Sequence, residues 1–346
     1  DEEKILSAVS YSFNVLNENK KIWMGNNGEE KNSITVEYDM AGRKISLTAT
    51  DSGTKKWTYN KKGQLCYYTD EELEQKGKKV EYLYDGFGRI VKIDYPESED
   101  VLYKYGNDLQ KSVNGAGRII AVNDETGYTE FEYGSLGEIT KERRSINHVR
   151  SFVKKAENAE MEYTGDYLGR IEKIKYPDGE TVLYGYDSGG QIKSVTGKFA
   201  ETDFIYIKNI EYDEFGQRKL VEYGNGVKTE YSYDAVHRWL NYIHTENNSE
   251  VLQNIDYSFD LTGNITEYKN THKEMTYSTV QKYSYDDLYQ LTSVTGQCIY
   301  NPYQLSIPAF KSEYGQSFVY SDDGLNRMES KTSVEESIGS AKISSN

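Results

Sequence analysis

The stretch of sequence that decides the fold is residues 79–91, which read KVEYLYDGFGRIV. Aromatic and branched side chains alternate with polar ones on both sides of a short central segment, which is the pattern of strands with one packed and one wet face. The central segment begins at Asp85, whose carboxylate can cap backbone N–H groups, and contains Gly88, which can adopt a positive φ. A short glycine-containing loop between two alternating runs predicts a β-hairpin.

This aromatic–Asp–x–x–Gly–Arg signature recurs along the chain at intervals of about 20 to 30 residues, a spacing that fits one or two hairpins. A repeat sets the whole architecture and favours an extended scaffold over a single catalytic cleft. We therefore predict an all-β chain of tandem antiparallel hairpins. The predicted turn residues are Asp39, Gly42, Arg43, Asp85, Gly88, Arg89, Asp166, Gly169, Arg170, Asp187, Asp213, Gly216, Asp234, Asp260, Gly263 and Asp286.

Some copies of the signature are incomplete. The Asp is missing at Gly106 and Gly134, and the Arg is replaced at Gln191 and Gln290. We expect these turns to be less regular. His237 stands in the Gly position of its copy, so we interpret it as a turn residue.

The charges of the signature have a structural interpretation. Arg89 stands four residues after Asp85, across the turn, so the two side chains can pair, and the same holds for Asp39 and Arg43. An exposed pair of this kind contributes only about 0–1 kcal/mol. A second recurring turn, clearest at Tyr176–Gly179, has the Pro and Asp–Gly of a tight turn, so the repeating unit is strand, Asp turn, strand, second turn.

Tyrosine is unusually frequent, at 33 residues against 10 Phe and 3 Trp. Its ring packs while its hydroxyl stays hydrated, which suits a thin sheet. Tyrosines two residues apart before the Asp should share a face, pack between neighbouring repeats and stabilise the array instead of contacting a ligand. These residues are Tyr82, Tyr84, Tyr184, Tyr186, Tyr231, Tyr233, Tyr283 and Tyr285.

We divide the chain into lead-in strands at 1–33, the repeat array at 34–328 and a C-terminal tail at 329–346 that we expect to be a poorly packed end. The repeat breaks at 70–77, a charged loop or single helical turn, and at 145–160 and 299–315. Such insertions are either tolerated surface loops or part of a binding face.

The composition and charge of the chain exclude some classes of partner. A net charge of −15 opposes binding to nucleic acid and to anionic membranes. No apolar run is long enough for a transmembrane helix. The chain starts at Asp1 without a signal-like stretch, and we interpret it as a piece of something longer, so export stays open.

We find no catalytic, cofactor or metal constellation in the sequence. Cys66 and Cys298 have no metal-ligand neighbours at the required spacing. The histidines at 148, 237, 244 and 272 are scattered, and no nucleophile elbow, phosphate loop or dinucleotide fingerprint occurs. Residues 322–327 fail the EF-hand template and read as a degenerate repeat turn. We expect no enzyme activity and no cofactor.

The repeated signature and its Tyr–Pro–Asp–Gly partner resemble the YD repeats of the rearrangement-hot-spot (RHS) family over roughly residues 34–328. The resemblance implies a strip of hairpins that spirals into a hollow shell. In bacterial polymorphic toxins and toxin complexes such a shell encloses a C-terminal toxic domain, and in teneurin-like surface proteins a similar barrel serves adhesion. The Asp–Pro motif of the family's self-cleaving region has no match here.

Two hypotheses follow. The first is a non-catalytic wall module of a secreted or contact-dependent bacterial toxin, whose partners are the remaining shell and the enclosed toxin domain of the same polypeptide. The alternative is an adhesion or glycan-binding module that recognises a cell-surface glycan or receptor through Trp23, Trp57 and Trp239. Both imply a secreted or bacterial cell-surface location.

Overall fold

The computed structural model describes residues 8–24, 31–107, 114–146, 158–248, 250–270, 277–300, 310–321, 328–337 and 343–345. Within these ranges the chain consists of strands joined by turns, with one short helix, α1 (Glu71–Gln75). Neighbouring strands pair antiparallel, and the predicted all-β fold is confirmed. The chain divides into two compact units, Ser7–Leu183 and a second that contains Tyr184–Asn346.

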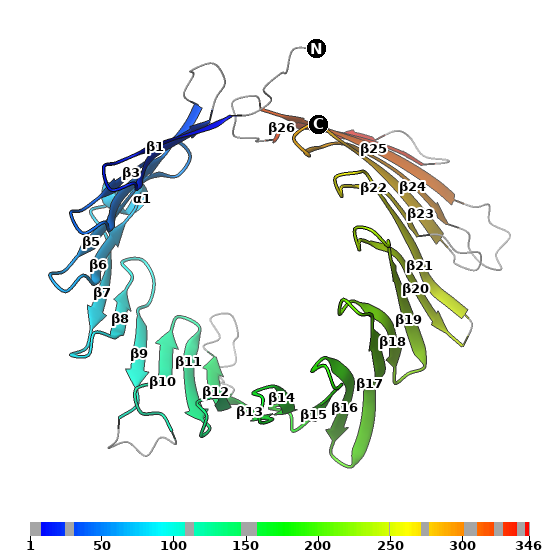
Figure 1. The fold of residues 1–346 in the computed structure, drawn as a ribbon, viewed down its shortest axis with the longest axis horizontal. Coiled ribbons are helices and arrows are strands. Elements are labelled where there is room, and N and C mark those ends of the chain that lie inside the picture. The colour runs from blue at the N-terminus through cyan, green and yellow to red at the C-terminus, as the bar shows by residue number, and fades with distance from the viewer. Residues whose placement is uncertain are drawn as a thin grey trace. The chain divides into compact units, whose positions relative to one another are not determined.

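In the first unit each strand pairs with the next strand along the chain, and the sheet is curved (Figure 1). The strands are β1 (Val9–Phe13), β2 (Asn19–Met24), β3 (Lys31–Tyr38), β4 (Lys44–Ala49), β5 (Gly53–Tyr59), β6 (Leu65–Thr69), β7 (Val80–Tyr84), β8 (Ile90–Asp94), β9 (Val101–Tyr105), β10 (Ile119–Asp124), β11 (Gly127–Tyr133), β12 (Ile139–Ile146), β13 (Asn158–Gly165) and β14 (Ile171–Lys175). Strand β15 (Thr181–Tyr186) spans the boundary between the units.

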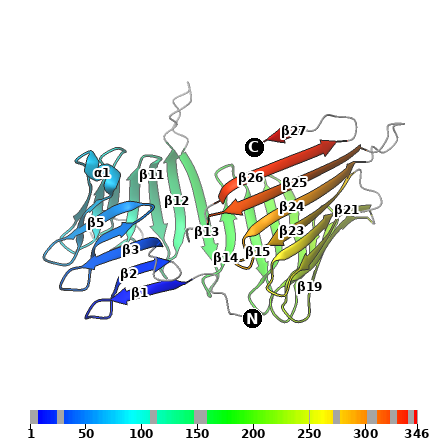
Figure 2. The ribbon, with the colours of Figure 1, turned by 90° about the horizontal axis from the view of Figure 1, so that it is seen from above.

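The second unit follows the same plan, with longer strands that lie side by side (Figure 2). They are β16 (Ile192–Phe199), β17 (Thr202–Tyr212), β18 (Arg218–Tyr223), β19 (Val227–Tyr233), β20 (Leu240–Asn247), β21 (Glu250–Phe259), β22 (Ile265–Asn270), β23 (Tyr277–Tyr285), β24 (Leu291–Tyr300), β25 (Phe310–Tyr320), β26 (Met328–Ser337) and β27 (Ile343–Ser345).

Because strand direction alternates, the Asp turns of a unit all lie at one edge of its sheet and the second turns at the other. The strand that enters an Asp turn shifts register just before the turn, as between Leu83 and Tyr84 and between Ser284 and Tyr285. A shift of this kind increases the local twist and re-aims the next side chain. The side chain just before the turn, which is a tyrosine in most repeats, is therefore held in a specific orientation.

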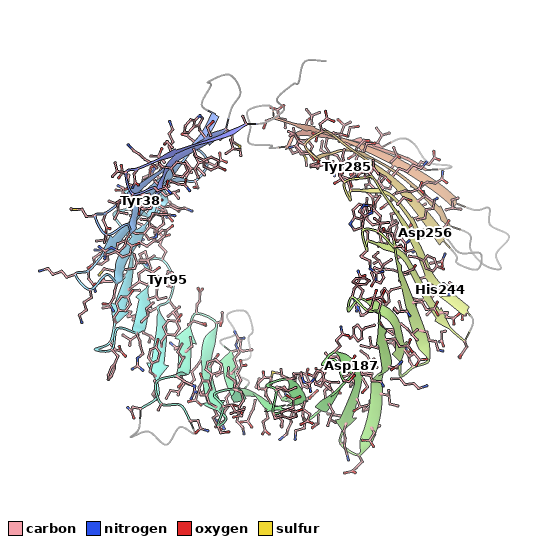
Figure 3. All side chains as sticks on the ribbon, viewed as in Figure 1. Tyr38, Tyr95, Asp187, His244, Asp256 and Tyr285 are labelled. Carbon is pink, nitrogen blue, oxygen red and sulfur yellow. The ribbon has the colours of Figure 1, made fainter. Side chains whose placement is uncertain are left out.

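The sheet has a thin core. Side chains project from both faces, and among the described residues no second layer covers either face (Figure 3). The most buried apolar side chains, such as Val36 (6% exposed) and Val80 (5% exposed), alternate with polar residues and share a face with the tyrosines of their strands. No described side chain is fully buried. Contacts between neighbouring strands must therefore supply most of the stability.

Of the three segments that interrupt the repeat, one lies within the described residues and two lie largely outside them. Residues 70–77 contain the predicted helical turn, α1, whose first turn is capped by the Asp70 carboxylate, which accepts from the Leu73 N–H at 2.9 Å. The insertions at 145–160 and 299–315 lie largely outside the described residues, as do His148, His272 and residues 322–327.

Part of the tail expected at 329–346 lies in a strand, Met328–Ser337. This segment forms β26, which pairs with β25 along its length. From Met328 to Val334 its side chains are nonetheless largely exposed, including Met328 (51%) and Val334 (43%). Backbone hydrogen bonds to β25 hold this strand in the sheet, and amino-acid composition does not predict such bonds.

We expect Gly88→Val to destabilise the protein by about 1 kcal/mol or more, because a branched side chain is strained at the φ of 84° that Gly88 adopts. A Cβ there would also lie 3.1 Å from the Gln64 amide nitrogen. Urea unfolding followed by circular dichroism measures the change. Gly86→Val is the control, because Gly86 belongs to the same turn, has no positive φ, and a Cβ there would meet nothing within 4 Å. Equal destabilisation by both variants would contradict the assignment.

Candidate functional site: the turn edge of the repeats

Apart from the turn at Asp234, the Asp turns are closed by a common set of hydrogen bonds. At Asp85 the backbone N–H donates to the Arg89 carbonyl at 2.9 Å, and the Gly88 N–H donates back to the Asp85 carbonyl at 3.1 Å. Carboxylate oxygen Oδ1 accepts from the N–H groups of Phe87 and Arg89, both at 2.9 Å. The Asp thus satisfies donors inside the turn that the sheet ladder cannot reach. The same cap is present at Asp39, Asp166, Asp213, Asp260 and Asp286.

The turn glycine adopts the left-handed conformation that the sequence predicts. Its φ is 75° at Gly42, 84° at Gly88, 79° at Gly169, 79° at Gly216 and 93° at Gly263. Such values favour glycine because it has no Cβ.

The signature Arg makes two kinds of contact. Arg89 pairs with Asp85 of its own turn, with Nε and Nη2 at 2.7 and 2.6 Å from Oδ2. Its guanidinium also lies over the ring of Tyr105 in the next repeat, 4.2 Å from the centroid. Arg43 likewise pairs with Asp39 and covers Tyr59, at 4.7 Å. The Arg therefore joins one repeat to the next, a role that its spacing from the Asp did not indicate.

At most turns the residue just before the turn is a tyrosine, which completes this connection. Its hydroxyl donates to the backbone carbonyl of the residue that follows the Arg position of the preceding repeat. Tyr84 reaches Leu65 at 2.8 Å, and Tyr105 reaches Ile90 at 3.0 Å. The same bond is made by Tyr38, Tyr59, Tyr133, Tyr212, Tyr233, Tyr285 and Tyr320. We call the tyrosine hydroxyl bond and the contact of the Arg position together the seam between two repeats.

The predicted tyrosines divide into two positions. Those directly before the Asp, Tyr84, Tyr233 and Tyr285, make the seam bond. Tyr82, Tyr231 and Tyr283 lie two residues earlier on the same face, where partial burial raises the pKa of each hydroxyl. Tyr184 and Tyr186 lie at the corresponding positions of β15. Close cross-strand ring pairs occur at other positions, such as Trp57–Tyr68 (5.9 Å) and Tyr257–Tyr268 (5.6 Å).

The expectation of irregular turns where Arg is replaced is wrong. The turn from Asp187 to Gln191 closes with the standard bonds, at 2.9 and 3.1 Å, and Asp286 with Gln290 does the same. The amide of Gln191 donates to the carbonyl of Gly216 in the next turn at 3.4 Å. A glutamine therefore replaces the guanidinium–ring contact with a hydrogen bond across the seam.

Loss of the Asp is also compensated at Gly134. The Glu138 carboxylate folds back, accepts from the Leu136 N–H at 3.0 Å and occupies the space of the missing side chain. The turn closes with bonds of 2.8 and 3.1 Å. At Gly106, by contrast, the closing bond reaches Arg118, so an insertion separates the two ends of the turn.

The turn at Asp234 contains one extra residue, and this corrects the position assigned to His237. The Asp234 N–H donates to Trp239, and the left-handed residue is Arg238, with a φ of 63°. Arg238 pairs with Asp213 of the preceding turn and lies over Phe215 at 4.3 Å. His237 is still in the turn, where it stacks on Trp239 at 4.2 Å.

Sequence reasoning missed a repeat near the N-terminus. Asn14 closes a turn with Glu18, and its side-chain oxygen accepts from Leu16 and Glu18 at 2.9 and 3.0 Å. Asn17 takes the Gly position with a φ of 63°. Phe13 before Asn14 was the available signal, but neither Asp nor Gly is present. The lead-in strands β1 and β2 are therefore a hairpin of the array itself.

The turn carboxylates are stabilised in their ionised form. The pKa of Asp39 is lowered by the Arg43 side chain and backbone N–H, and the pKa of Asp85 by the backbone N–H and side chain of Arg89. Hydrogen bonds inside the turn lower the pKa of Asp234 and Asp260 as well. These ions are capping groups for the backbone.

The described residues contain few groups that are placed to form a catalytic or metal site. No cluster of three or more His, Cys, Asp and Glu side chains there is placed to hold a metal ion. Cys66 and Cys298 are half-buried free thiols. No helix in the described ranges is long and apolar enough to cross a membrane.

We expect Tyr84→Phe to lower stability by about 0.5–1.5 kcal/mol, because the Leu65 carbonyl loses the hydroxyl donor while the ring is retained. Tyr82→Phe is the control, since this ring lies on the same face of β7 and its hydroxyl makes no hydrogen bond to another described residue. Chemical denaturation of the three proteins gives the comparison. A seam role requires the Tyr84 variant to be the less stable of the two.

Stability should fall at acid pH through the turn carboxylates. Because their pKa is lowered on folding from the ordinary value of 3.8, their contribution is complete above that value and is lost as the pH falls through the folded pKa. Urea midpoints of wild type and Asp85→Asn should therefore differ most at pH 7, and the difference should shrink as the pH falls below 3.8 through the lowered pKa of Asp85. A constant gap from pH 7 to pH 2.5 would contradict this account.

The known proteins whose sequences resemble this chain include toxin subunits. No protein-family model matches the chain. It is 31% identical over 154 residues to toxin subunit YenC1 of Yersinia entomophaga, which is 40% of this chain and 15% of that protein. It is 35% identical over 133 residues to YenC2 of the same organism, covering 34% and 14%. The double-stranded DNA deaminase toxin A of Burkholderia cenocepacia (strain H111) is 23% identical over 252 residues, covering 60% and 17%. The chain thus spans less than a fifth of each relative's length.

Solved structures share the fold. A crystal structure of TcdB2-TccC3-Cdc42 superposes with a TM-score of 0.79 at 19% identity, covering 98% of this chain and 18% of that one. The Photorhabdus luminescens Tc holotoxin pore gives a TM-score of 0.78 at 19% identity, with the same coverage. The repeats, the shared fold and these relatives together support the resemblance to RHS/YD-repeat proteins of the toxin-complex type.

Proposed function

We propose that this chain is a non-catalytic wall module of a shell that encloses a C-terminal toxin domain in a secreted or contact-dependent bacterial toxin. The observation that carries the proposal is the seam. Signature side chains such as Asp85, Arg89 and Tyr105 are engaged in closing turns and joining repeats. Residues used in this way build a continuous surface, which is what a wall requires. The similarity to toxin subunits supports the same function.

The partners that we propose are parts of the same polypeptide: further shell segments and the enclosed toxin domain. A secreted or bacterial cell-surface location follows from that role. The net charge of −15 argues against nucleic acid as a partner of the wall. We propose no cofactor.

Adhesion through aromatic platforms has less support. Trp57 packs against Tyr68 at 5.9 Å, and Trp239 packs against Phe259 at 5.2 Å. These rings contribute to packing between neighbouring strands, so they are poor candidates for an open glycan platform.

The test uses the native gene that encodes this chain. Enclosure predicts that its product contains further YD repeats followed by a C-terminal domain of different composition, and that this domain resists protease until the wall is opened. Limited proteolysis with mass spectrometry identifies the fragments. A wall variant with Gly88→Val and Tyr84→Phe should release the C-terminal domain at lower protease concentration, and Gly86→Val with Tyr82→Phe is the matched control.

Two results would contradict enclosure. One is a gene product in which membrane-anchoring or adhesion domains stand in place of a toxin domain. The other is a C-terminal domain that protease cleaves equally fast in wild type and in the wall variant.

A further inference from the structure

The seam that leads into the Asp166 turn lacks both of its usual side chains. The position before the Asp is Gly165, which pairs with Ile171 after the same register shift that Tyr84 makes with Ile90. The Arg position of the preceding repeat is Glu138, which folds back to cap its own turn. These two positions therefore supply neither a tyrosine ring nor a long donor side chain to this seam.

A cavity of about 500 Å³ lies at this place, between the two turns. Its volume is in the range of pockets that hold small ligands, about 300–1,000 Å³. A Cβ on Gly169 would meet no atom within 4 Å, whereas one on Gly216 would lie 3.0 Å from the Gln191 amide of the preceding repeat. The cavity is thus the space that the Arg-position and tyrosine side chains fill at regular seams.

The lining combines apolar, acceptor and acidic groups. Leu136, Ile139 and Ile171 provide exposed apolar surface (76%, 41% and 43% exposed). The carbonyl of Ile139 stands where the seam acceptors Leu65 and Ile90 stand in other repeats.

The charge of the lining is negative. Glu138 and Glu142 face the cavity, and Asp166 is already paired with Arg170 at 2.6 Å. Among the described residues, the Glu142 carboxylate accepts a long bond, 3.4 Å, from the Tyr163 hydroxyl. An occupant with an aromatic hydroxyl and a positive charge matches this set of groups.

We propose that this cavity binds a peptide segment of the form Tyr–x–Arg. In an extended peptide the two side chains point to the same face. The tyrosine ring lies against Leu136 and Ile171, its hydroxyl donates to the Ile139 carbonyl, and the guanidinium pairs with Glu142. The peptide thereby supplies in trans the two groups that Tyr105 and Arg89 supply at their seam.

The probe is acetyl-Tyr-Gly-Arg-amide, titrated into the intact chain by isothermal calorimetry. We expect saturable binding that is weakened about fivefold or more when Phe replaces Tyr or Gln replaces Arg, since each change removes one hydrogen-bonding group. Absence of saturable binding at millimolar probe, or equal affinity for the three peptides, would overturn the proposal.

Two variants locate the site. Gly165→Tyr supplies the missing ring from the chain itself, because a Cβ there makes only an ordinary 3.5 Å contact with the Arg170 carbonyl. It should weaken binding about tenfold or more, equivalent to 1.4 kcal/mol, and raise the melting temperature. Thr164→Tyr, with its side chain on the opposite face, is the matched control and should leave binding unchanged. Equal binding by wild type and a folded Gly165→Tyr would place the peptide elsewhere.

Glu142→Gln provides an independent test that does not depend on how Gly165→Tyr folds. It should weaken binding of the Tyr–Gly–Arg probe while leaving the Tyr–Gly–Gln peptide unaffected. Glu130→Gln, on the opposite face where Glu130 accepts from Tyr128 at 3.1 Å, is the control. Loss of affinity in the control but not in Glu142→Gln would overturn the assignment of the acidic partner.

Discussion

The structure depends on the hydroxyl bond that the tyrosine before most of the turns makes to a backbone carbonyl of the preceding repeat. A single-layer sheet has no opposing layer to bury its side chains, and no described side chain here is fully buried. Each repeat must therefore obtain its stability from its neighbours, as in other repeat proteins. Tyrosine suits this role because its ring covers apolar surface while its hydroxyl reaches a carbonyl. This explains why the chain contains 33 tyrosines and few other aromatic residues.

Different side chains can occupy the Arg position of a seam. The hydrogen bonds that close the turn do not depend on the contact that this side chain makes with the neighbouring repeat. The Asp cap and the left-handed residue fix the turn, whether the fourth residue after the Asp is Arg89 or Gln191. Arg89 then covers the next tyrosine ring, whereas Gln191 donates to the next turn's carbonyl. At Asp234 the left-handed Arg238 reaches back to Asp213, so the contact runs in the opposite direction. The array keeps its form although its sequence is irregular.

Most of the fold could be predicted from the sequence, because alternation and turn chemistry are local. The strands, the glycine conformation at Gly88 and the Asp85–Arg89 pair all follow from spacing within about ten residues. The partner of each tyrosine hydroxyl could not be predicted, since Tyr84 donates to a carbonyl 19 residues earlier. The Asn14 repeat was hidden because both Asp and Gly are replaced. The role of Glu138 could not be predicted, because its side chain stands in the Arg position but folds back to cap its own turn.

A double-mutant cycle on Arg89 and Tyr105 tests most directly whether contacts across the seam hold the repeats together. Arg89→Ala, Tyr105→Ala and the double variant would be unfolded in urea, with Arg89→Ala and Tyr128→Ala as a distant reference pair. The account predicts a coupling energy of about 0.5–1 kcal/mol between Arg89 and Tyr105, the range of an exposed cation–π contact, and none in the reference pair. Additive effects of Arg89→Ala and Tyr105→Ala would contradict it.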